Sequence, residues 1–246
     1  MRDTLKSKEY FDAYINRELQ TIEFFSSSLE NNDQPDNIER IERLQRGITG
    51  ALVKIIHARY SRGDKVSDIK PQMDEVIRRS LTSSQPHENY NETLYMLAYI
   101  ILFNEPRDLL GEFRSLFFKN PDKKIPAVDG LLDFLTTGEK NDEGLIWKKQ
   151  FDRLWQVVLS DSPEEQNKRL TDFMKRWYGS KKGNFWYNEH KKSSLDDMDF
   201  ATYKGYWCWE AGAVAKLLNI PDENLKDHPN YPYDLVHFKD DKGETK

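Results

Sequence analysis

The chain has 246 residues, of which 37% are hydrophobic and 13% aromatic, so it is long and apolar enough to bury a core without covalent staples. Its net charge of −5 argues against a general nucleic-acid binder, which would carry a basic surface, and is compatible with a basic protein partner. A single cysteine excludes an internal disulfide, and no run of about 20 apolar residues occurs, so we expect a cytoplasmic protein without a membrane helix.

In the first half of the chain, apolar residues recur at helical spacing. Glu18 falls on the apolar face of the first predicted helix, either as a paired buried carboxylate or at the edge of that face. Gly47 and Gly50 weaken the second helix. We attribute the presence of glycine at these positions to the close approach of a neighbouring helix. Arg59 extends the apolar stripe of the same helix and is a candidate counter-ion. The predicted helices of this half cover residues 8–30, 37–62, 67–82, 91–103, 105–118 and 127–135.

Two segments with turn composition divide the chain further. Gly63, within an Arg-Gly-Asp tripeptide, is interpreted as the turn that ends the second helix. Residues 136–144, TTGEKNDEG, contain two glycines, several charges and no apolar residue. They are the predicted boundary between two parts, residues 1–137 and residues 145–240.

Beyond this boundary, helices predicted at 145–159 and 163–177 form a hairpin, and an aromatic loop follows at 178–188. Ser194, with Asp197 three residues later, is typical of a capping box at the start of a helix. No period-2 alternation indicates a strand. The predicted fold class is therefore all-α, with an N-terminal helical bundle and a C-terminal aromatic-rich helical domain.

The densest aromatic clusters lie in residues 203–238, where a mostly buried helix is predicted at 206–219. Glu210 lies in the apolar face of this helix, where a carboxylate costs several kcal/mol, roughly, unless it is paired. It is either a catalytic carboxylate with a raised pKa or a structural one held by an Arg, a Tyr hydroxyl or backbone N–H groups. The segment 229–233 is predicted to be extended, as an aromatic strap across the domain or as a polyproline-type ligand for a partner.

No metal, nucleophile or nucleotide motif accompanies Glu210, and the five histidines are scattered. Cys208 lies in an apolar run and is expected to be inert. Glu189 and His190 could form an acid–base pair, but a solvated loop histidine fits the composition better. We therefore expect no cofactor, no metal, no small-molecule ligand and no enzymatic activity, but a protein that recognises another protein. The alternatives are an enzyme that uses Glu210 as acid or base in an aromatic pocket, for example on a sugar, and a helical adaptor.

The stretch YKGYWCWEAGAVAKLLNI, followed by DHPNYPYDLVHF, resembles the signature of the C-terminal domain of the PoNe immunity proteins. The opening, MRDTLKSKEYFDAYINRELQTIE, is similar to the start of that family's N-terminal domain. The family consists of two-part helical proteins that neutralise polymorphic DNase toxins delivered between competing bacteria. The residues that carry the resemblance are Tyr203, Gly205, Tyr206, Trp207, Glu210, Ala211, Leu218, Tyr231, Pro232, Tyr233 and Asp234.

The resemblance implies an antitoxin that binds a cognate DNase toxin domain stoichiometrically and covers its DNA-binding face or active site. A DNase has a basic surface because it must attract phosphates, and an acidic inhibitor surface can complement that charge. We therefore expect acidic loop residues to bind the toxin, and the motif residues, Tyr206, Trp207 and Glu210 among them, to serve the fold. The candidate toxin-binding residues are Glu139, Asp142, Glu143, Asp196, Asp197 and Asp199.

Overall fold

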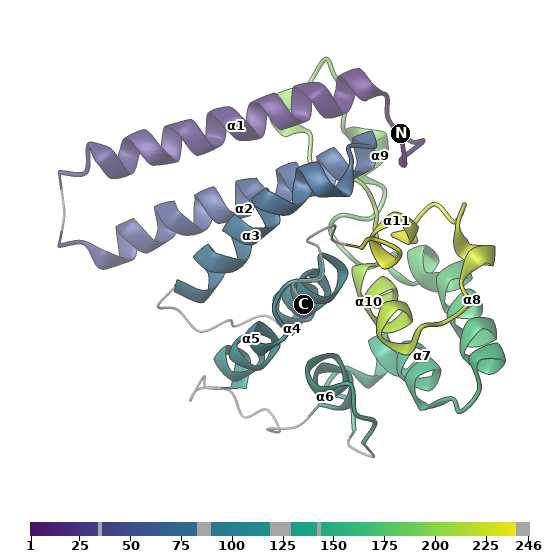
Figure 1. The fold of residues 1–246 in the computed structure, drawn as a ribbon. Coiled ribbons are helices and arrows are strands. Elements are labelled where there is room, and N and C mark those ends of the chain that lie inside the picture. The colour runs from purple at the N-terminus through teal and green to yellow at the C-terminus, as the bar shows by residue number, and fades with distance from the viewer. Residues whose placement is uncertain (34–35, 83–89, 119–128, 142–143, 240–246) are drawn as a thin grey trace. The chain divides into compact units, whose positions relative to one another are not determined.

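The structure, a computed structural model, describes residues 1–33, 36–82, 90–118, 129–141 and 144–239 (Figure 1). These ranges contain eleven α-helices, two short 3-10 helices and no strand, which confirms the all-α prediction. None of the described helices combines the length and the apolarity needed to cross a bilayer. The helices are α1 (Lys8–Glu30), α2 (Ile38–Arg62), α3 (Val66–Thr82), α4 (Tyr90–Leu102), α5 (Asp108–Phe118), α6 (Gly130–Thr137), α7 (Lys148–Leu159), α8 (Pro163–Ser180), α9 (Glu189–Lys192), η1 (Met198–Phe200), α10 (Trp209–Leu218), η2 (Glu223–Leu225) and α11 (Tyr233–Val236).

Two predictions about local structure in the second half were wrong. The capping box at Ser194 does not form, and the short helix η1 begins only at Met198. The helix predicted from residue 206 begins at Trp209, because Gly205 has a φ of 104° and the Cys208 N–H donates to the Asn230 carbonyl over 2.8 Å. The helix ends at Asn219 as predicted, in the left-handed conformation that commonly closes helices.

The chain divides into two compact units that differ from the predicted parts. Unit 1 comprises Met1–Ser84 and Lys182–Tyr206, and unit 2 comprises Gln85–Lys181 and Trp207–Lys246. The chain therefore begins in unit 1, passes into unit 2, returns to unit 1 at Lys182 and passes into unit 2 a second time between Tyr206 and Trp207. The predicted boundary at residues 137–145 does not coincide with the limits of these units. It stays a prediction about domains along the sequence.

Unit 1 is built on the hairpin of α1 and α2, with α3 packed against α2 (Figure 1). Gly47 permits a close approach in this hairpin, since a Cβ there would lie 2.5 Å from the Phe25 ring. A Cβ at Gly50 would have no neighbour within 4 Å, so the same prediction for Gly50 was wrong. Glu18 is buried and paired with Arg17 at 2.5 Å and Lys54 at 3.2 Å. Of the two interpretations, the paired buried carboxylate is therefore the correct one.

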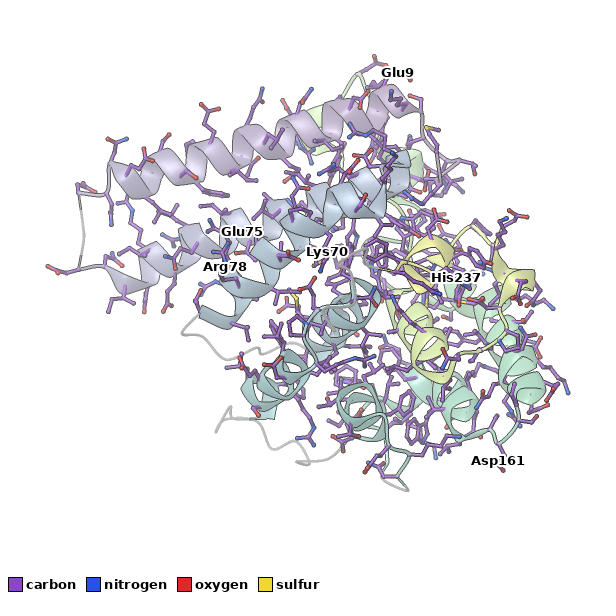
Figure 2. The ribbon with its side chains drawn as sticks, viewed as in Figure 1. Glu9, Lys70, Glu75, Arg78, Asp161 and His237 are labelled. Atoms are coloured by element: carbon purple, nitrogen blue, oxygen red, sulfur yellow. The ribbon has the colours of Figure 1, made fainter. Side chains whose placement is uncertain are left out.

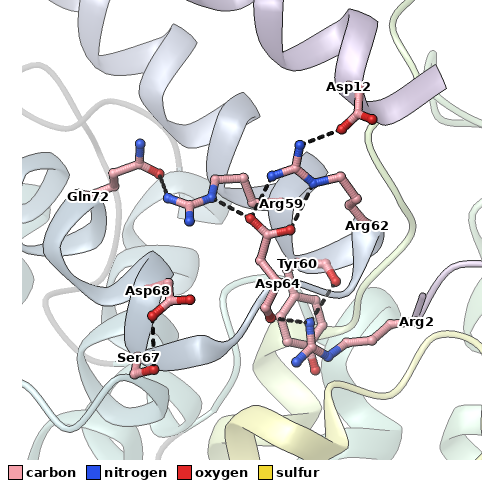
Figure 3. A network of polar contacts seen from close by, with 9 residues as sticks. All are labelled: Arg2, Asp12, Arg59, Tyr60, Arg62, Asp64, Ser67, Asp68 and Gln72. Atoms are coloured by element: carbon pink, nitrogen blue, oxygen red, sulfur yellow. Dashed lines mark hydrogen bonds and ion pairs between the residues drawn. The ribbon is translucent and has the colours of Figure 1, made fainter. Parts of the chain in front are cut away.

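The turn between α2 and α3 is organised by Asp64 (Figure 3). Gly63 closes α2 with a φ of 100°, which confirms the predicted turn. The carboxylate of Asp64 then accepts hydrogen bonds from Arg59 and Arg62, each at 2.7 Å. Burial alone would raise the pKa of Asp64, but these two guanidinium groups lower it. Arg59 thus has a counter-ion, and Arg62 also reaches Asp12 on α1 at 2.6 Å.

Helix α3 carries ion pairs between residues one turn apart. Glu75 is paired with Arg78 and Arg79, and Lys70 with Asp74. Figure 2 shows Lys70, Glu75 and Arg78 along this helix. The two pairs of the partly exposed Glu75 contribute only about 0.3–0.5 kcal/mol each, so α3 is held mainly by its buried face, to which Lys70 also belongs.

Unit 2 is centred on α4, whose residues are nearly all buried and which packs against α5, α6 and α10. This confirms the predicted central helix. The α7–α8 hairpin also forms, and Ser162 caps α8 by accepting from the Glu165 N–H. The ammonium group of Lys216 on α10 donates to the carbonyls of Leu102 and Leu235 at 2.8 and 3.1 Å, which satisfies carbonyl groups at two helix ends.

Candidate functional site

Three of the candidate acidic residues, Asp196, Asp197 and Asp199, lie in unit 1 in one turn, residues 193–202, which we call the acidic turn. The hydroxyl of Ser193 closes this turn by accepting from the backbone N–H groups of Thr202 and Tyr203 at 3.0 and 3.1 Å. All three carboxylates are exposed, with Asp196 and Asp197 just before η1 and Asp199 within it. The side chain that organises the turn is therefore Ser193, not the predicted cap at Ser194.

The acidic turn is fastened to α1 by charged and hydroxyl donors. The guanidinium group of Arg17 donates to the carbonyls of Met198 and Ala201, the latter at 2.6 Å. The Tyr10 hydroxyl donates to the Tyr203 carbonyl at 2.7 Å. Hydrogen bonds from charged donors are stronger than neutral ones, so α1 holds the backbone of the turn in one conformation.

Exposed apolar side chains flank the three carboxylates of the acidic turn. Phe200 is 80% exposed and Leu195 is 49% exposed. Sequence reasoning selected the carboxylates but missed these two residues. The signal was present as an apolar residue on each side of the aspartates, but periodicity cannot distinguish an apolar residue that faces the core from one that faces solvent.

The fourth described candidate, Glu139, lies in unit 2, just after the left-handed cap of α6 at Gly138. It is exposed at the edge of a groove of about 420 Å³, whose lining includes the ion pair of Arg114 and Asp133 at 2.5 Å. The structure thus distributes the candidates over two units. Asp142 and Glu143 lie outside the described residues.

The first motif residues are built into the core of unit 1. Tyr203 is buried, and its hydroxyl donates to the carboxylate of Asp3. Burial raises the pKa of Asp3, and the hydrogen bonds from Tyr203 and from the backbone oppose that rise. Tyr206 accepts from the His190 backbone N–H at 3.1 Å, so His190 lies half-buried in α9 and not in a solvated loop as predicted. Gly205, with its positive φ, allows the chain to turn between the two tyrosines.

Glu210 lies in a closed part of unit 2 and is only 1% exposed. Its Oε1 accepts from the indole N–H of Trp177 at 3.2 Å, whereas its Oε2 has no hydrogen-bond partner among the described residues. The predicted partners, an Arg, a Tyr hydroxyl or backbone N–H groups, were therefore wrong. Burial raises the pKa of the neighbouring Cys208 thiol, and the charge of Glu210 raises it further, which favours the thiol over the nucleophilic thiolate.

A second buried carboxylate in unit 2, Asp129, has a complete set of structural partners. It caps α6 by accepting from the Leu132 N–H at 2.9 Å, and it also accepts from the Ile146 N–H at 2.7 Å and from the Tyr90 hydroxyl at 2.9 Å. Burial raises the pKa of Asp129, and these donors oppose the rise. Asp129 is thus held by three donors, whereas Glu210 is held by one.

The C-terminal motif residues surround Asp222, which sequence reasoning missed. Asp222 is fully buried and accepts from the Tyr231 hydroxyl at 2.5 Å and from His237 Nε2 at 2.8 Å. Tyr233 does not continue an extended strap, because it begins the short helix α11 and packs against His237 with ring centroids 4.2 Å apart. Asp234 is exposed in the first turn of α11, where the helix dipole favours a negative charge. Trp207, by contrast, is buried.

Within the described ranges, no group of three or more His, Cys, Asp or Glu side chains could hold a metal ion.

Comparison with protein families shows to which family the chain belongs. Residues 2–113 match the model of the N-terminal part of the PoNe immunity protein (PoNi), and residues 127–235 match the model of the C-terminal part. This chain belongs to the PoNe immunity protein family. The PoNi C-terminal match includes the 203–235 motif stretch, and the N-terminal match includes α1 with Arg17, which fastens the acidic turn.

A solved structure supports the fold of this PoNi chain. The crystal structure of protein PA2201 from Pseudomonas aeruginosa superimposes with a TM-score of 0.68 at 15% sequence identity, covering 96% of this chain and 89% of that one. At this identity the likeness concerns the fold alone. No curated protein matched the chain in a sequence comparison.

Proposed function

We propose that this PoNi chain binds a cognate DNase toxin domain in a one-to-one complex and neutralises it by covering its DNA-binding face or its active site. Family membership supports an immunity role. The observation that carries the finer proposal is the exposed trio of Asp196, Asp197 and Asp199 on a turn that α1 holds in place. We assign the complex to the cytoplasm of the cell that produces the toxin.

The physical argument rests on charge complementarity. A nuclease attracts DNA through Lys and Arg side chains that contact phosphates, so its substrate face is basic. An inhibitor with an acidic surface and a net charge of −5 competes with DNA for that face and associates faster through long-range attraction. Inhibition then needs no chemistry from the inhibitor, and we assign structural roles to the buried Asp129 and Glu210.

Glu139 is proposed as a second contact, together with Asp142 and Glu143. Its exposed position after α6 leaves its carboxylate accessible to a partner. Because Glu139 belongs to unit 2 and the acidic turn to unit 1, the two regions are to be tested by separate variants.

The test is co-expression of the neighbouring toxin's C-terminal domain with and without this chain, scored by survival, by integrity of genomic DNA and by purification of a complex. We expect rescue together with a one-to-one complex that weakens as the salt concentration rises. The triple variant D196N/D197N/D199N should weaken the complex, and E164Q, an exposed carboxylate in the first turn of α8, is the matched control.

Two results would contradict the proposal. Rescue without a complex would indicate an enzymatic antidote and would return attention to Glu210. Absence of rescue with any adjacent toxin would refute the DNase-inhibitor function while leaving the fold unchanged.

A further inference from the structure

The acidic turn carries an aromatic side chain that the fold of unit 1 leaves in solvent. Phe200 is 80% exposed, although it directly precedes Ala201, which is buried and whose carbonyl accepts from Arg17. Large aromatic side chains supply much of the binding energy of protein interfaces, because they bury a large area and lose few rotamers. An exposed phenylalanine at the tip of a fixed turn therefore has the properties of an interface anchor.

The backbone that presents this ring is already ordered in the free protein. Within η1, the Phe200 N–H donates to the Asp197 carbonyl at 3.3 Å, and the Ala201 N–H donates to the Met198 carbonyl at 3.1 Å. The hydrogen bonds from Arg17 fix the two ends of this short helix to α1. Because the turn is already ordered, forming a complex through this ring costs little conformational entropy of the turn.

The charges beside Phe200 specify the chemistry of the partner. Asp196, Asp197 and Asp199 are exposed, and within the described residues none of them forms an ion pair. Of the cations that contact the turn, Arg17 is occupied by backbone carbonyls and by Glu18, and Lys6 donates to the Ser193 carbonyl. A surface that buries Phe200 must therefore place cations opposite three unpaired carboxylates.

We propose that Phe200 is the anchor of the toxin interface and that it inserts into an apolar pocket bordered by Lys and Arg side chains on the cognate toxin domain. This inference rests on the proposed function and adds a division of roles to it. Phe200 sets the lifetime of the complex, because its buried ring must leave the pocket before dissociation. The three aspartates set the association rate, because their field acts before contact.

The test measures association and dissociation rates between the catalytically inactivated toxin domain and variants of the full chain by surface plasmon resonance at several salt concentrations. We expect F200A to raise the dissociation rate by about 10- to 100-fold, with little change in the association rate. D196N/D197N/D199N should lower the association rate and flatten its dependence on salt. F185A and F24A, which remove rings that are 92% and 66% exposed in unit 1, are the matched controls and should leave both rates unchanged.

Folding of each variant is checked by circular dichroism and by the melting temperature. Because Phe200 is exposed, F200A should leave both unchanged. F200L, which keeps an apolar side chain, should restore part of the lifetime. If the wild-type chain binds and F200A dissociates at the wild-type rate, the inference fails and the proposed function stands. If the wild-type chain forms no complex, both fail. If Phe200 instead mediates dimers of this chain, detected by sedimentation of F200A against wild type, the anchor role toward the toxin is refuted.

Discussion

Gly47 and Gly50 lie about one turn apart in α2, yet an added methyl group would meet different surroundings at the two positions. At Gly47 the methyl carbon would lie 2.5, 2.8 and 2.9 Å from three carbons of the Phe25 ring on α1. At Gly50 no described atom lies within 4 Å. The two substitutions G47A and G50A therefore separate the helix propensity of alanine from a steric contact within one helix.

The expected magnitudes follow from these distances. Alanine is better than glycine in a helix interior by about 0.8–1 kcal/mol, so G50A should raise the free energy of unfolding by about that amount. G47A has the same gain, but it must displace the Phe25 ring, and overpacking of this kind costs about 1–3 kcal/mol. G47A should therefore lie between neutral and about 2 kcal/mol destabilising. The ring is partly exposed and can rotate, which favours the lower end of that range.

A double-mutant cycle with F25A isolates the contact. In the F25A background the ring is gone, so G47A should become stabilising by about as much as G50A in the wild type. The coupling between positions 25 and 47 should then be about 1–3 kcal/mol. Urea unfolding followed by circular dichroism measures it from the midpoints at constant slope. The reasoning is refuted if G47A stabilises the intact protein as much as G50A does, or if G47A remains destabilising when Phe25 is absent.

Three further predictions concern buried groups. G212A should destabilise the protein by about 1–3 kcal/mol in urea unfolding, because its methyl carbon would lie 2.6 Å from the ring of Pro232, which cannot rotate away. D129A should lower the free energy of unfolding by about 2–4 kcal/mol, because it removes the cap of α6 and leaves the buried Tyr90 hydroxyl without its acceptor, and D129N should cost less. Burial and the Lys54 charge lower the pKa of Lys204 from 10.5 to about 8. Between those values the unfolded chain binds more protons at this group, so stability should rise with pH above about 8, and K204M should reduce that slope in unfolding measured from about pH 7.5 to 9.5.

Each of these predictions has an internal comparison. G111A, in a helical position of α5 with no described neighbour within 4 Å, should be stabilising where G212A is not. An equal loss of stability in D129A and D129N would contradict the capping role of Asp129. A slope that is unchanged in K204M would show that other groups cause the pH dependence.

The sequence by itself determined the helices. The first three helices of the structure, α1 to α3, follow the predicted ranges closely, because apolar periodicity and the turn at Gly63 are signals carried by neighbouring residues. Asn219 before Ile220 and Pro221 likewise ended α10 where expected. The composition of residues 203–238 also identified the family, and the family models agree with that resemblance.

Only the tertiary structure decided the partners of these helices and the surface that they leave. Glu210 is bonded to Trp177, which lies 33 residues earlier, and the acidic turn is held by Arg17, which lies 184 residues before Ala201. The division into two interleaved units and the exposure of Phe200 depend on the same kind of contact. Periodicity reports which side of a helix is apolar, because that is a property of residues within one or two turns. It cannot report which distant segment covers that side, because many pairings of apolar faces bury similar areas and the choice between them rests on a few specific side-chain contacts.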